Sequence, residues 1–103
     1  MRFVLAALIA AATPDADRWT FCVAESGHEI WITDVFAAER QRERLEADFE
    51  AFLRAHGVER AVAQCPEPQR DKIDVVNSQF TAAEFHRKLG DTLHSAAAPD
   101  AGR

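Results

Sequence analysis

Two cysteines, Cys22 and Cys65, are the residues with the widest choice of chemistry in this chain. A thiol pair can form a disulfide, hold a metal ion or supply a nucleophile. A structural metal site generally needs four ligands, and the sequence has no CxxC or HxxxH spacing that would complete one. A catalytic thiol needs a nearby base, and no Cys–His motif is present. The sequence predicts a disulfide between Cys22 and Cys65, with two free buried thiols as the main alternative.

Four histidines are the other side chains suited to catalysis or metal binding. His28 lies beside a predicted turn, and His56 closes a predicted helix, where a cation suits the helix dipole. His86 and His94 are eight residues apart across a glycine, which is not a dependable ligand spacing. No nucleophile elbow, phosphate loop, zinc-protease motif or dinucleotide fingerprint is present. We therefore predict no catalytic residue, no metal and no cofactor; a cleft holding His86 or His94 beside a carboxylate would favour an enzyme instead.

One face of a predicted sheet is the candidate binding surface. Strand alternation places Thr20, Trp31 and Thr33 on the same side as Cys22, and we expect this side to point away from the helices. A large aromatic ring on a surface of small side chains is a typical contact for a ligand or partner. The alternative is that Trp31 packs over the disulfide and shields it.

The elements that position these residues follow from local patterns. Residues 19–24 and 30–36 alternate as strands and predict a hairpin with its turn at Ser26-Gly27, in which Val23 faces Ile30. Two amphipathic segments, residues 38–56 and a stretch beginning near residue 69, predict helices. The expected apolar stripes are Leu45, Phe49, Phe52 and Leu53 in the first helix, and Ile73, Val76, Phe80 and Ala83 in the second.

The second helix carries a candidate break between Ser78 and Thr81, because a capping box begins there. Residues 58–65 predict a third strand and residues 91–96 a candidate fourth. The sequence thus predicts an α+β fold of order ββαβα(β), in which both helices pack on one face of a small sheet.

The first seventeen residues differ in character from the rest. Arg2 precedes an uninterrupted apolar run from Phe3 to Ala12, which small residues and Pro14 follow. This pattern predicts a signal peptide in residues 1–17, cleaved near residues 12–17, because the run is too short to span a bilayer. The alternative is a buried N-terminal strand or helix. Cleavage would leave one domain, residues 18–96, and a tail, residues 97–103, that we expect to be disordered.

The length, net charge and expected compartment of the chain limit the classes of function to consider. A chain of 103 residues is one domain, and a net charge of −5 without a basic patch argues against nucleic acid as a partner. Small exported domains commonly carry a disulfide. We expect a periplasmic or secreted, non-enzymatic binding or accessory module of a bacterial cell envelope, with a protein or a cell-wall ligand as partner and no membrane insertion after cleavage.

Two alternatives come from other functional classes. In layout the chain resembles sporulation-related repeat domains, which bind cell-wall glycan on a sheet face. Their usual order is βαββαβ, whereas this chain opens with a predicted hairpin. The resemblance implies a glycan-binding domain, in which Trp31 would contact the sugar. The other alternative is a small secreted enzyme or an inhibitor of a secreted hydrolase.

Overall fold

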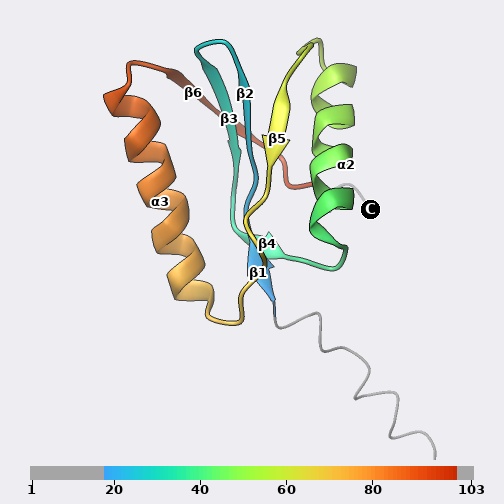
Figure 1. Cartoon of the computed structure of the whole chain (residues 1–103), viewed down its shortest axis with the longest axis vertical. Helices are drawn as coiled ribbons and strands as arrows, with labels where there is room; N and C mark the ends of the chain where they lie inside the picture. The colour runs from blue at the N-terminus through green and yellow to red at the C-terminus, as the bar shows by residue number, and fades with distance from the viewer. Residues whose placement is uncertain (1–17, 100–103) are drawn as a thin grey trace, which may run out of the picture.

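The computed structural model describes residues 18–99, which form a four-stranded sheet, a two-stranded ribbon and two helices (Figure 1). The elements are β1 (Trp19–Thr20), β2 (Val23–Ser26), β3 (Glu29–Thr33), β4 (Phe36–Ala37), α2 (Arg42–Ala55), β5 (Val62–Gln64), α3 (Lys72–Lys88) and β6 (Thr92–Ala96). The predicted α+β class and the order ββαβα(β), with a last strand, are confirmed. The predicted signal peptide and residues 100–103 of the predicted tail lie outside the described residues.

The main sheet has the strand order β5-β2-β3-β6, in which β3 and β6 run parallel and the other pairs run antiparallel. The β2–β3 hairpin turns at Gly27 and His28, one residue later than predicted, so that Val23 lies opposite Ile32 and not Ile30. Gly27 has a φ of 64°, which suits glycine at the first central position of a hairpin turn. The register moves by two residues, so Val23, Ile30 and Ile32 still share one face.

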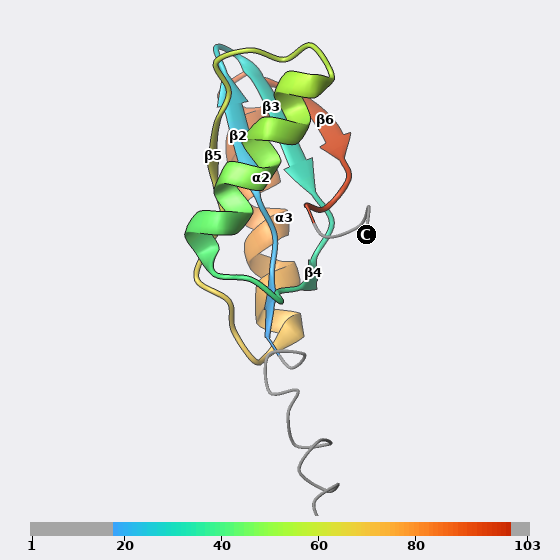
Figure 2. The same ribbon diagram turned by 90° about the vertical axis from the view of Figure 1, so that its right-hand side faces the viewer.

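The two helices lie on opposite faces of the sheet, which corrects the expectation that both pack on one face (Figures 1 and 2). α2 buries the predicted residues Leu45, Phe49 and Leu53. The strand residues in the same core cluster are all small, namely Cys22, Ala24, Ala63 and Cys65. The small side chains that suggested an open face are the ones that let a Phe- and Leu-bearing helix approach closely. The opposite face, where Ile30 is buried, is the one that α3 covers.

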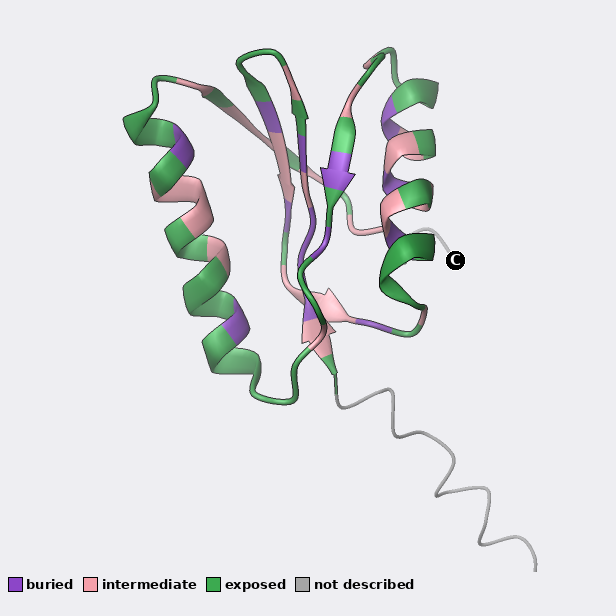
Figure 3. Cartoon of the chain, viewed as in Figure 1, coloured by how far each residue is buried: buried purple, intermediate pink, exposed green. Residues whose placement is uncertain are grey.

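α3 is one continuous helix with no break between Ser78 and Thr81, but it is rotated relative to the prediction. Its buried residues are Val75 and His86. Polar contacts fix this rotation: Gln79 Nε2 donates to the carbonyl of Thr33 at 2.7 Å, and His86 Nδ1 lies 2.9 Å from an oxygen of Asp91. The predicted buried stripe is corrected, because Ile73, Val76 and Phe80 are exposed. Exposed residues accordingly extend along much of α3 in Figure 3.

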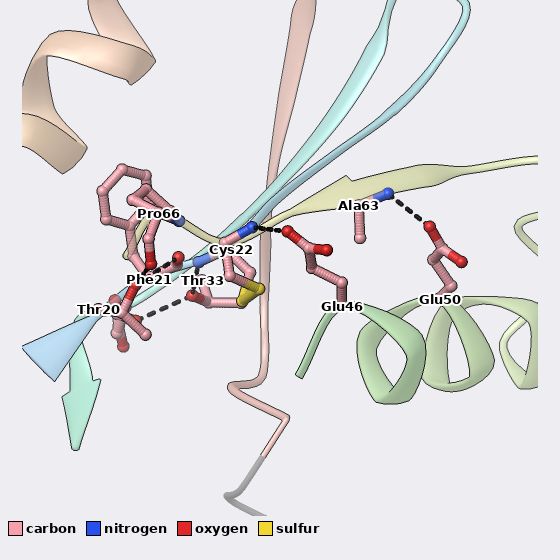
Figure 4. Close-up of a disulfide and its surroundings, with 10 residues drawn as sticks. Thr20, Phe21, Cys22, Thr33, Glu46, Glu50, Ala63 and Pro66 are labelled. Carbon is pink, nitrogen blue, oxygen red and sulfur yellow. Dashed lines mark hydrogen bonds between the residues drawn. A yellow bond between two sulfur atoms is a disulfide. The ribbon is translucent and has the colours of Figure 1, made fainter. Parts of the chain in front are cut away.

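A disulfide joins Cys22 and Cys65, whose Cα atoms are 4.1 Å apart, and confirms the predicted pairing. Beside it, Glu46 of α2 accepts a hydrogen bond from the amide of Cys65 at 2.9 Å, and Glu50 accepts one from Ala63 at 2.8 Å (Figure 4). β5 is an edge strand, and these carboxylates occupy amide donors that would otherwise be open to another strand. The disulfide links the end of β5 to β2, and the two hydrogen bonds link α2 to β5.

Replacing both cysteines, Cys22→Ser with Cys65→Ser, should lower the free energy of unfolding by about 4 kcal/mol, the chain-entropy value for a loop of this length. The loop closed by the disulfide spans 43 residues, and a domain of this size has little other stability to lose. Urea denaturation without reductant measures the difference between the oxidised protein and the double variant. The two proteins should become similar when reductant is added. Equal midpoints without reductant would contradict a stabilising disulfide.

Candidate functional site

Two of the predicted binding residues, Thr20 and Thr33, are buried in the fold and do not face solvent. The hydroxyl of Thr20 donates to the carbonyl of Pro66 at 2.8 Å, and the hydroxyl of Thr33 accepts from the amide of Cys22 at 2.9 Å (Figure 4). Both hydroxyls therefore satisfy backbone groups next to the disulfide. Because both side chains are buried, neither hydroxyl is open to a ligand at the surface.

Trp31 is half-buried at the margin of the α2 core. Its ring stacks on the imidazole of His94, with the ring centroids 4.9 Å apart and the planes at 21°. Nε2 of His94 is in turn hydrogen-bonded to Glu29. Trp31 is thus partly covered by the core on one side and by the His94 ring on another. The choice between ligand contact and shielding of the disulfide stays a prediction.

A groove with a volume of about 830 Å³ lies between α3 and the strands β2 and β5. It forms because α3 packs against β1 and β6 and leaves the neighbouring part of the sheet uncovered. Six of its lining residues define what we call the β5–α3 groove: Val23, Glu25, Val62, Gln64, Ala82 and His86. Polar and apolar residues line the groove in about equal number, and Arg42, Glu46 and Arg60 are among the charged ones.

Large apolar side chains stand exposed beside the β5–α3 groove. Val62 of β5 and Phe85 of α3 are both more than half exposed. Phe85 lines a smaller hollow that shares Ala82 and His86 with the groove, so the two hollows are adjacent. Exposed apolar residues that gather around a concavity are typical of a binding surface, whereas isolated ones are common on any protein.

Asp91 joins two histidines at one end of the groove. One of its oxygens lies 3.1 Å from Nδ1 of His28 and the other lies 2.9 Å from Nδ1 of His86. The Asp91 side chain is only 8% exposed. Hydrogen bonds from His86 and then from His28 hold the pKa of the Asp91 carboxyl below its ordinary value of 3.8. Because Nδ1 of His86 is engaged with Asp91, Nε2 is the ring nitrogen left for Glu25, whose carboxylate lies 3.9 Å away.

The pairing of His86 with Asp91 was missed in the sequence, although a local signal for it exists. Gly90 has a φ of 86°, and the amide of Asp91 donates to the carbonyl of His86 at 3.0 Å. A glycine that ends a helix in the left-handed conformation returns the next residue toward the last turn. The pattern His-x-x-x-Gly-Asp therefore predicts this contact better than the distance between His86 and His94 does.

Replacing Asp91 by Asn should destabilise the protein most at neutral pH. The folded-state pKa of Asp91 is lowered, so its ionised form adds stability above the unfolded value near pH 4, and this stability is lost as the pH falls through the lower folded value. The difference in unfolding free energy between the natural protein and Asp91→Asn should therefore shrink on acidification. Urea denaturation from pH 7 to pH 2 measures it, and a difference independent of pH would contradict the assignment.

Comparisons with known proteins give no match from which a function could be taken. No protein-family model matches the chain, and neither the curated proteins nor the solved structures give a significant match. Within residues 18–99, no group of three or more His, Cys, Asp or Glu side chains is arranged to hold a metal ion. Over the same residues, neither helix has the length and apolar character needed to cross a membrane. The function of the groove is therefore inferred from its own residues.

Proposed function

We propose that this protein is an exported, disulfide-stabilised binding module of the bacterial cell envelope that holds a short segment of a partner protein in the β5–α3 groove. The observation that carries the proposal is the groove itself, with Val62 and Phe85 exposed beside it. This surface replaces the Trp31 face as the binding surface, because α2 covers that face. A groove of this size is within the range of sites that hold small ligands and short peptide segments.

The lining of the groove suggests the chemistry of its partner. Val23 and Val62 offer apolar contact, and the groove has charged side chains of both signs, Glu25 and Glu46 together with Arg42 and Arg60. Recognition by adding a strand to β5 is disfavoured, because Glu46 and Glu50 already accept hydrogen bonds from amides of Cys65 and Ala63 at this edge. The expected ligand is thus a peptide read through its side chains, with apolar residues next to charged ones.

The compartment is part of the proposal. A disulfide in a domain this small is compatible with an oxidising environment, since cytosolic reductants keep most thiols reduced. The pattern of residues 1–17 adds the expectation of a cleaved signal peptide. These two observations together support the proposed periplasmic or secreted localisation.

A peptide library displayed on phage tests the binding role. Selection on the immobilised, oxidised protein should enrich short peptides with apolar residues beside charged ones, and Val62→Asp should weaken binding of the selected peptides at least tenfold. Leu89→Asp is the control, because Leu89, which directly follows α3, is an equally exposed apolar residue that does not line the groove. Failure to enrich any peptide, or equal binding by Val62→Asp, would count against the groove. Cell-wall glycan fragments form a second arm, in which a change in tryptophan fluorescence would favour the glycan-binding alternative.

Hydrolysis is a second candidate function, and the position of His86 favours it. In this candidate, Asp91 orients the imidazole through Nδ1, as the carboxylate does in acid–base catalytic triads, and Nε2 accepts a proton from a water that attacks an ester or amide bound in the groove. Glu25, 3.9 Å from Nε2, could hold the imidazolium that forms.

A panel of p-nitrophenyl esters tests the hydrolytic candidate. The oxidised protein should release p-nitrophenol well above the buffer rate, and His86→Gln should reduce kcat/KM about 100-fold, the lower range for loss of a general base. His94→Gln serves as the control, because His94 stacks on Trp31 on the other face of the sheet. Rates equal to buffer, or equal in both variants, would leave the binding role as the better account.

A further inference from the structure

We propose that α3 is also a dimerisation helix, on which the α3 of a second copy of this chain packs antiparallel. The contact is the exposed stripe of Ile73, Val76 and Phe80. Phe80 and Ala82 point about 160° apart on a helix of 3.6 residues per turn, so the stripe lies on the side of α3 away from the groove. The proposal therefore does not depend on what the groove binds.

The exposure of the stripe is the first observation. Ile73 is 69% exposed, Val76 43% and Phe80 62%, and their spacing of three and four residues aligns them along one side of the helix. A surface helix normally turns such a stripe toward its own core. In α3 the hydrogen bond from Gln79 to the carbonyl of Thr33 holds the stripe outward. An apolar stripe held in solvent in this way is typical of an interaction site.

The stripe is complementary to itself, which is the reason to infer a second copy as the occupant. A twofold axis beside Ser78 with antiparallel helices sets Val76 against Phe80 of the second copy, and Phe80 against Val76 in return. The same register sets Ile73 against Ala83, a half-buried residue whose single methyl leaves room for the larger side chain. Each large side chain of the stripe thus gains an apolar partner from one symmetric operation.

Charge complementarity supports the antiparallel arrangement. The helix has Asp71 and Asp74 at its start and Arg87 with Lys88 in its last turn. Antiparallel packing brings unlike ends and opposed helix dipoles together, whereas parallel packing would bring like charges together. A net charge of −5 also makes an anionic lipid surface an unfavourable occupant.

Sedimentation velocity across a concentration series tests the dimer with the purified, oxidised protein. The natural protein should sediment at twice the monomer mass at high concentration, and Phe80→Lys should raise the dimer dissociation constant at least 30-fold. Leu89→Lys is the control, because Leu89, which directly follows α3, is equally exposed on the opposite side and should leave the dissociation constant unchanged. A monomer at all concentrations, or a dimer unaffected by Phe80→Lys, would overturn the proposal.

Discussion

The disulfide between Cys22 and Cys65 holds together the part of the structure on which the rest depends. Cys22 directly precedes β2 and Cys65 directly follows β5, so the bond closes the end of this antiparallel pair. β5 has only three residues, and a strand that short has few ladder hydrogen bonds with which to hold an edge. Val62, on that strand, forms one wall of the groove. The covalent attachment of β5 therefore fixes both the strand against which α2 packs and the shape of the binding surface.

Much of the fold could be predicted because its signals are local. The hairpin follows from alternation and a turn glycine, α2 from the spacing of Leu45, Phe49 and Leu53, and the disulfide from cysteine number and size. The assignment of faces could not be predicted in the same way. One face of the sheet carries mostly small side chains at its centre, and the other carries Ile30 and Ile32. A helix could cover either face. Alternation states which residues share a face, but it does not state what covers that face.

The candidate site was missed for the same physical reason. Alternation puts Thr20 and Thr33 on a face expected to be open, whereas both are buried in the folded protein. The groove depends on where α3 stops covering the sheet, which is a property of packing and not of any short stretch of sequence. The rotation of α3 depends on Gln79 meeting the carbonyl of Thr33, a contact between residues 46 positions apart. Only the approach of Asp91 to His86 had a local signal, in the glycine between them.

The polar anchoring of α3 explains how one helix can show apolar residues on two sides. A helix oriented by apolar burial alone must turn its widest apolar stripe inward, because that rotation has the lowest free energy. Hydrogen bonds from Gln79 and His86 set a different rotation, which leaves Phe80 free on one side and Phe85 on the other. If the first side pairs with a second copy, both β5–α3 grooves stay open, since they lie on the other side of the helix. Such a dimer would present two grooves in a fixed, symmetric relation, and a repetitive or multimeric partner would then bind more tightly than either groove alone allows.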